Sequence, residues 1–115
     1  MSEHVNINRI QETSGGDTEF ERELIEMYLE DAGQHLENIK LRLGKQDFKA
    51  IRQSAHTLKG SSANIGALSL ERVAFEIERA AMNDDTPRLS ALLPELEENY
   101  AGTQQQYRRY VATIS

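Results

Sequence analysis

A regular spacing of apolar residues in the second quarter of the chain constrains the fold more than any other feature. Six residues recur at alternating intervals of four and three: Ile25, Leu29, Ala32, Leu36, Ile39 and Leu43. This spacing places them on one face of an α-helix, because a helix turns by about 100° per residue. A helix that is apolar on one face must pack that face against other elements. The chain is therefore expected to fold as several helices around a shared core.

Three further segments carry a helical pattern, and residues that begin or end helices separate them. The residues expected to face the core in the next two helices are Phe48, Ile51, Ala55, Leu58, Ile65, Leu70, Val73, Ile77 and Ala80. The last helix is expected to begin with Thr86 as N-cap and Pro87 as its first residue. Pro94 lies inside this last pattern, where proline removes a hydrogen bond, so a kink or break is predicted near Leu93.

The N-terminal part of the chain predicts a short additional helix. Its core-facing residues would be Val5, Ile7 and Ile10. The long helix that follows is expected to begin at a capping box with Thr18 as N-cap, and Asp17 is the alternative cap. A second apolar strip on the long helix is expected to cover the short helix rather than to dock a partner: Phe20, Leu24 and Met27.

The composition supports this fold and narrows the classes of function. Short connections between helices of this length, within 115 residues, predict a single domain over residues 1–115. The expected fold is all-α, an antiparallel up-down four-helix bundle with a short extra N-terminal helix. A net charge of −6 disfavours binding to nucleic acid or anionic membranes, and the lack of cysteine excludes disulfides. With no signal-peptide pattern and no membrane-length apolar run, we expect a cytoplasmic protein. We also expect it to be a monomer.

A second face of the helix predicted over residues 48–65 carries a histidine among cations: Lys49, Arg52, His56 and Lys59. These side chains share an arc of about 80°, centred roughly 110° from the core face. His56 is therefore expected to project into solvent. An unperturbed imidazole titrates near pH 6.5, so a neutral nucleophilic nitrogen is available at about pH 7. Lys59, and less directly Arg52 and Lys49, would offset the charge of an anionic group bound there.

Gly60 lies four residues after His56 and so on the same side of the helix. A glycine inside a helix costs about 1 kcal/mol relative to alanine. On an exposed face, close packing between helices does not offset that cost. The use that fits is clearance, which lets another molecule approach the imidazole.

The sequence lacks the features that a phosphoryl-transfer enzyme needs. Such enzymes hold a metal with carboxylates or cradle phosphate with a glycine-rich loop. The Gly15-Gly16 pair lacks the lysine and spacing of such a loop, and no tight acidic cluster accompanies His56. Asp31 and His35 lie four residues apart, but no further metal ligand is evident. We therefore expect no metal and no cofactor in this chain, and a carrier whose partner supplies the metal and most of the catalysis.

The segment AHTLKGSSANIG, residues 55–66, resembles the central motif of histidine-containing phosphotransfer (HPt) domains. That motif is His, any residue, Leu, Lys, Gly, and a second Gly six residues later, and every fixed position is present here. The resemblance implies that His56 is phosphorylated on Nε2, that Lys59 stabilises the phosphoryl group, and that Gly60 leaves room for a receiver domain. It also implies a residue on the next helix that holds the other ring nitrogen. Counting 22 residues from His56 indicates Glu78, with Glu76 as the nearby alternative.

The resemblance implies a phosphorelay intermediate. Such a protein accepts a phosphoryl group from a receiver-domain aspartate or a histidine kinase and passes it to a response-regulator aspartate. Its partners are receiver domains of response regulators or hybrid histidine kinases, and Lys49 and Arg52 would then be docking residues or ordinary solvated ones. One alternative is a non-catalytic adaptor bundle, against which the intact His56, Lys59 and Gly60 argue. The other is a phosphoacceptor domain cut from a chemotaxis-type kinase, although these 115 residues contain no ATP-binding domain.

Overall fold

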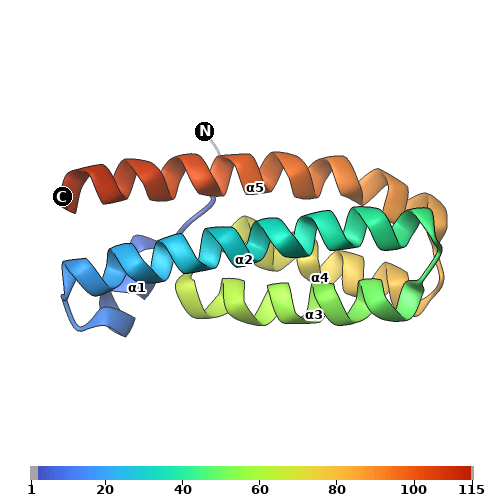
Figure 1. The fold of residues 1–115 in the computed structure, drawn as a ribbon, viewed down its shortest axis with the longest axis horizontal. Helices are drawn as coiled ribbons and strands as arrows, with labels where there is room; N and C mark the ends of the chain where they lie inside the picture. Colours follow the sequence, from blue (N-terminus) through green and yellow to red (C-terminus); the bar gives the residue numbers. More distant parts are fainter. Residues whose placement is uncertain (1–2, 115) are drawn as a thin grey trace.

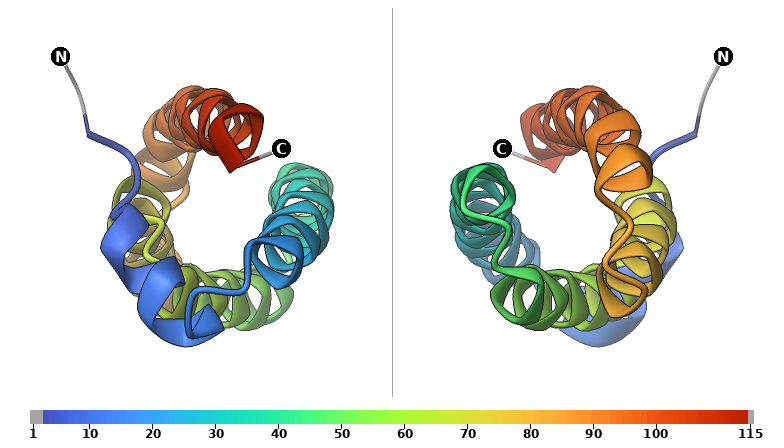
Figure 2. Two further views of the ribbon diagram at one scale, coloured as in Figure 1. Left: turned by 90° about the vertical axis from the view of Figure 1, so that its left-hand side faces the viewer. Right: turned by 90° about the vertical axis from the view of Figure 1, so that its right-hand side faces the viewer.

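The computed structural model describes residues 3–114, and every regular element in that range is a helix (Figure 1). The helices are α1 (Ile7–Ser14), α2 (Thr18–Gly44), α3 (Phe48–Ile65), α4 (Leu68–Met82) and α5 (Thr86–Ile114). Viewed end-on, α2 to α5 form a ring in which each helix contacts its two neighbours, and α1 packs against α2 and α3 (Figure 2). The expected four-helix bundle with a short N-terminal helix is confirmed. No helix in the described range is long and apolar enough to cross a membrane.

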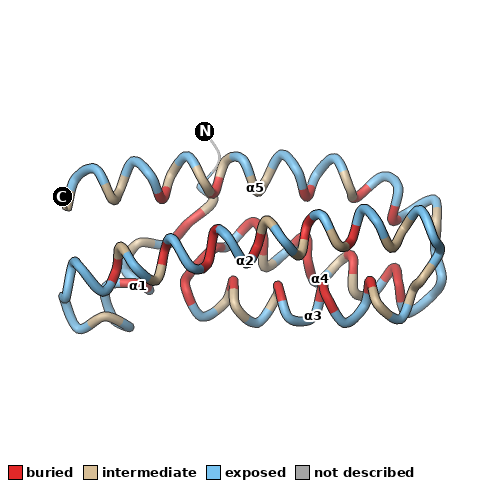
Figure 3. The backbone as a smooth tube through the Cα atoms, in the orientation of Figure 1, coloured by how far each residue is buried: buried red, intermediate tan, exposed pale blue. Residues whose placement is uncertain are grey.

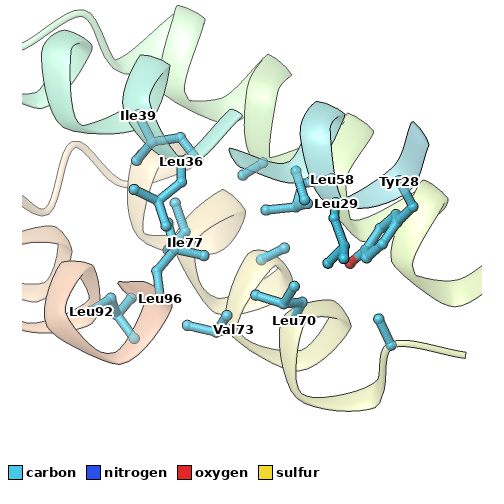
Figure 4. Packing of buried hydrophobic residues seen from close by; sticks show 14 of the residues in the cluster. Tyr28, Leu29, Leu36, Ile39, Leu58, Leu70, Val73, Ile77, Leu92 and Leu96 are labelled. Carbon is cyan, nitrogen blue, oxygen red and sulfur yellow. The ribbon is translucent and has the colours of Figure 1, made fainter. Parts of the chain in front are cut away.

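The core consists of the apolar faces that the sequence periodicity indicated (Figure 3). On α2, five of the six periodic residues are buried, and Leu43 is half-buried against the same cluster. They meet Leu58 of α3, Ile77 of α4, and Leu92 and Leu96 of α5 (Figure 4). Burying one such side chain stabilises the fold by about 1.5–3 kcal/mol, so this shared cluster holds the helices together.

Two helices begin one residue away from the predicted cap. The side chain of Asp17, not of Thr18, accepts a hydrogen bond from the backbone N–H three residues on, at 3.1 Å. In the same way Asp85, rather than Thr86, accepts from the N–H three residues on, at 3.0 Å. A carboxylate at an N-cap accepts a hydrogen bond and also meets the positive end of the helix dipole. The predicted capping role is therefore wrong for both threonines, although Asp17 had been the alternative.

Helix α5 runs without interruption past Pro94, so of the kink or break predicted near Leu93 the break is wrong. A proline inside a helix lacks the backbone N–H that would make one hydrogen bond, and its ring crowds the carbonyl four residues earlier. On either side of Pro94, Leu92 and Leu96 are completely buried in the core. Packing of this apolar face holds the helix together across the missing hydrogen bond.

Two buried tyrosines fix the C-terminal half of α3. The hydroxyl of Tyr28 lies 2.6 Å from Oγ of Ser62, and that of Tyr107 donates to the carbonyl of Ile65 at 2.8 Å. Their rings pack edge to face with centroids 6.1 Å apart. Burial raises the pKa of both phenols, so they remain neutral hydrogen-bonding groups. Ser62, a small polar residue of α3, is both buried and hydrogen-bonded.

We expect Gly66→Ala to destabilise the fold by at least about 1–2 kcal/mol, the cost of left-handed backbone for a residue with a Cβ. Gly66 has a φ of +83°, and a Cβ there would lie 2.7 Å from the carbonyl oxygen of Asn6. Denaturant unfolding followed by circular dichroism measures the effect. Gly60→Ala is the matched control, since Gly60 is helical and has open space around it. Equal unfolding free energies for the two variants would contradict this account.

Candidate functional site

His56 lies on the outer face of α3, with 68% of its side chain exposed. Asp47 caps the start of this helix. The residues on either side of His56 in the helical pattern, Ala55 and Leu58, are buried in the core. His56 thus points away from the core, as its angular position predicted. Lys49 and Arg52 are also exposed on α3.

One carboxylate of α4 connects the histidine to the nearby lysine. Oε2 of Glu78 lies 2.8 Å from Nδ1 of His56, and Oε1 of Glu78 accepts a hydrogen bond from Nζ of Lys59 at 2.6 Å. Only 14% of the Glu78 side chain is exposed. Glu76, the alternative, instead lies 3.7 Å from the guanidinium of Arg88 on α5. The structure therefore places Glu78, and not Glu76, against the imidazole.

The charge of Glu78 decides which ring nitrogen of His56 carries the proton. Burial by itself raises the pKa of Glu78, but the hydrogen bonds from Lys59 and His56 outweigh it and hold the pKa below its ordinary value. Glu78 is therefore an ionised carboxylate at neutral pH and can only accept hydrogen bonds. Nδ1 of His56 must donate, which leaves the lone pair on Nε2.

The three histidines of the chain differ in what their second ring nitrogen meets. Nδ1 of His4 and of His35 lies 2.6 and 2.7 Å, respectively, from a serine hydroxyl. Nε2 of His35 then lies 3.5 Å from the carboxylate of Asp31, and the ring of His4 packs against Gly102. Within residues 3–114, Nε2 of His56 has no hydrogen-bond or ion-pair partner. Only His56 combines a fixed Nδ1 with an open Nε2.

The side chain of Lys59 makes two contacts with α4 that sequence reasoning did not predict. Besides its bond to Glu78, its ammonium lies 5.4 Å from the ring centre of Phe75 on α4. Phe75 was missed as a neighbour of the site, although an aromatic residue three positions before Glu78 was visible in the sequence. The ion pair and the cation–π contact together hold the ammonium of Lys59 against α4. That Lys59 stabilises a phosphoryl group remains a prediction.

Gly60 is the mid-helix glycine that internal packing does not explain. A Cβ on Gly33 would lie 2.9 Å from the hydroxyl of Tyr100, and one on Gly102 would overlap the ring of His4. At Gly60 a Cβ would meet no atom of the described residues within 4 Å, apart from its own chain neighbours and the adjacent backbone of α3. Open space therefore lies beside His56, one helical turn along α3.

An open groove of 510 Å³ runs between α1, α2 and the C-terminal half of α3. Leu24 and Met27 of α2 line it together with Ile10 of α1 and Asn64 of α3. Leu24 is half-buried against the core, but Phe20 and Met27 remain 41% and 69% exposed. The expectation that this strip covers the first helix is therefore wrong for Phe20 and Met27.

The ionised Glu78 makes the free energy of unfolding depend on pH in the acidic range. A carboxylate whose pKa is lowered by folding stabilises the protein above its unfolded pKa of about 4.3, and the contribution is lost as the pH falls through the folded value. We expect the free energy of unfolding of wild type to exceed that of Glu78→Gln by about 1 kcal/mol at neutral pH. The gap should close in strong acid, as measured by urea unfolding at stepped pH. Glu76→Gln is the control, and a gap that stays constant with pH would contradict the coupling.

These features define an all-α bundle that presents a carboxylate-held histidine to solvent. Residues 23–106 match the family model of the Hpt domain, and the chain therefore belongs to the Hpt domain family. It is 31% identical over 84 residues to the phosphorelay intermediate protein rdeA of Dictyostelium discoideum. That alignment covers 73% of this chain and 33% of rdeA, so the match spans about a third of that relative.

Two solved structures share the fold. Histidine-containing phosphotransfer protein B (HptB) of Pseudomonas aeruginosa PAO1 superposes with a TM-score of 0.90 at 22% identity, covering 98% of both chains. The HPT domain of an Hpt sensor hybrid histidine kinase from Shewanella superposes with a TM-score of 0.69 at 23% identity. It covers 92% of this chain and 95% of its own. The bundle is thus the fold of known phosphotransfer domains.

Proposed function

We propose that this protein is a phosphorelay intermediate of two-component signalling, a phosphocarrier rather than an enzyme. It accepts a phosphoryl group on Nε2 of His56 from a receiver-domain aspartate or a histidine kinase and passes it to a response-regulator aspartate. The observation that carries the proposal is the exposed His56 ring, with Nδ1 fixed on an ionised carboxylate and Nε2 open. The proposed state is a cytoplasmic monomer in which residues 1–115 act as one domain, and its partners are proteins rather than nucleic acid or membrane.

The proposed transfer uses the lone pair that Glu78 leaves on Nε2. That lone pair attacks phosphorus, the N–P bond forms, and the bond from phosphorus to the donor's carboxylate oxygen breaks. The ring keeps its proton on Nδ1 and gains positive charge, which the ionised Glu78 stabilises at 2.8 Å. Onward transfer reverses these bonds on the acceptor's aspartate. Glu78 thus acts as a positioning and charge-stabilising residue, and the partner supplies the remaining catalysis.

The direct test is a panel of phosphorylated receiver domains, each mixed with this protein and sampled over time. We expect an acid-labile, base-stable phosphoryl group to appear on this chain and then on a second receiver domain. Binding without labelling would instead support the non-catalytic adaptor. Labelling only by an ATP-binding kinase domain, with none from receiver domains, would support the chemotaxis-type alternative. The relative described as a phosphorelay intermediate and the hybrid-kinase HPT domain favour the first outcome.

Lys59 is proposed to stabilise the transferred phosphoryl group, which carries about −1.5 to −2 charges. Lys59→Ala should slow transfer or shift the equilibrium towards the aspartyl phosphate by up to about tenfold, or 1.4 kcal/mol, because the site is open to solvent. Transfer kinetics at low and high salt measure this. Lys49→Ala and Arg52→Ala are the comparison variants: if these residues guide docking, their loss of rate shrinks at high salt. If Lys59→Ala transferred with the rate and equilibrium of wild type, its phosphoryl-stabilising role would be refuted. If the transfer rates of Lys49→Ala and Arg52→Ala showed no salt-dependent change, these two would be ordinary solvated residues.

A further inference from the structure

The outer face of α4 carries an exposed row of five residues with alternating spacings of four and three. We call this row the α4 stripe: Leu68, Arg72, Phe75, Arg79 and Met82. On a helix these positions share an arc of about 80°, directly opposite the face that packs into the core. Leu68, Phe75 and Met82 are 42%, 45% and 60% exposed. The apolar residues of the stripe therefore lie where a surface helix is normally most polar.

The stripe residues share one face of α4, and two of them are in contact. The guanidinium of Arg79 lies 5.7 Å from the ring centre of Phe75, so a cationic and an apolar group meet at the centre of the stripe. In the described residues, the large hydrophobic side chains exposed elsewhere, Phe20, Met27 and Leu41, all belong to α2. Three large hydrophobic side chains exposed on one face of a single helix make that face a candidate interaction site.

The charge of the stripe indicates the chemistry of its partner. The chain as a whole has a net charge of −6, yet the stripe holds two arginines and no carboxylate. Of the three glutamates beside it, Glu76 and Glu78 are already paired with Arg88 of α5 and with Lys59 of α3, whereas Glu71 forms no ion pair among residues 3–114. Neither Arg72 nor Arg79 forms an ion pair among the described residues, so both can pair with carboxylates from outside, and they favour an acidic partner.

The spacing of the stripe indicates the shape of its partner. The three apolar residues recur every seven positions, which keeps them in line along α4, and an arginine lies between each pair, so a helix lying along the stripe can contact all five residues. A second copy of this chain is a poor occupant. Symmetric parallel pairing would bring each arginine against itself, and antiparallel pairing about Phe75 would bring Arg72 against Arg79. We propose that the α4 stripe binds an acidic amphipathic α-helix of a partner protein, whose apolar residues cover Leu68, Phe75 and Met82 and whose carboxylates pair with Arg72 and Arg79.

The stripe is continuous with the His56 site. Phe75, at its centre, contacts the ammonium of Lys59, which binds the carboxylate that holds the imidazole. A helix docked on the stripe therefore lies beside the phosphoacceptor without covering it. The groove between α1, α2 and α3 remains a separate surface.

The test uses two synthetic helical peptides with leucine at heptad seam positions, one flanked by glutamate and one by lysine. Each is titrated into the isotope-labelled full chain and followed by NMR and calorimetry. We expect the glutamate peptide to bind with shifts confined to α4 and the side chains touching it, and the lysine peptide to bind at least about tenfold more weakly. Shifts centred on the α1–α2–α3 groove, equal binding of both peptides, or no binding would overturn the proposal. So would a dimer of the chain, seen by sedimentation, that buries the stripe.

Variants separate the stripe from general stickiness. Phe75→Ser should weaken binding of the glutamate peptide by about tenfold or more, whereas Leu41→Ser, 54% exposed on α2, should leave it unchanged. Replacing Arg72 and Arg79 together by glutamate should reverse the preference to the lysine peptide, a result that loss of structure cannot produce. An unreversed preference would overturn the charge assignment. No phosphoryl donor is present, so the outcome is independent of the proposed function.

Discussion

Replacing His56 with glutamine is expected to abolish phosphorylation while leaving the fold intact. The side chain is 68% exposed, so its replacement removes little packing and should change the unfolding free energy by about 0.5 kcal/mol or less. Glutamine can still donate a hydrogen bond towards Glu78, but its amide nitrogen has no nucleophilic lone pair. The loss should therefore be in transfer and not in stability.

The measurement is transfer of labelled phosphoryl from a phosphorylated receiver domain, with circular dichroism melts alongside. His35→Gln is the matched control, because Nε2 of His35 lies against Asp31 and is not expected to react. We expect full labelling of this control and none of His56→Gln. Labelling of His56→Gln to the wild-type level would sink the proposed function, since another residue would then be the acceptor.

The fold was predictable because apolar periodicity is a direct record of which face each helix buries. The spacing from Ile25 to Leu43 predicted the core face of α2 correctly. Helix starts were less predictable, since Asp17 and Thr18 are both competent caps and even replacing a cap by alanine typically costs only about 1 kcal/mol. The break predicted at Pro94 failed because burial of Leu92 and Leu96 outweighs one lost hydrogen bond.

Only those features of the site that depend on α3 alone were predictable from the sequence. The outward direction of His56 follows from its angle on α3. The choice between Glu76 and Glu78 does not, because the two are separated by about 200° of helical turn and only the packing of α4 decides which faces α3. Here Glu78 meets His56 while Glu76 meets Arg88. The contacts of Lys59 with Glu78 and Phe75 depend on the same packing, so sequence reasoning missed them.

Gly60→Leu is expected to fold at least as stably as wild type and yet to transfer phosphoryl groups about tenfold or more slowly. Glycine inside a helix costs about 1 kcal/mol relative to alanine, and the open space at Gly60 allows a side chain to be added without strain. The new side chain would occupy the approach to His56, one turn away. Displacing reacting groups by about 1 Å can slow a reaction by about a hundredfold, so partial obstruction suffices.

The decisive comparison sets stability against transfer across a graded series. From Gly60 through Gly60→Ala to Gly60→Leu, the transfer rate should fall with side-chain size, while neither substitution should lower the melting temperature. Gly44→Leu is the control, because Gly44 is also helical and open but lies at the end of α2; its transfer rate should match wild type. If Gly60→Leu were destabilised but transferred normally, the glycine would serve internal packing. Opposite trends in stability and rate would mean that the bare surface beside His56 is kept for the partner, because no packing contact among residues 3–114 needs it.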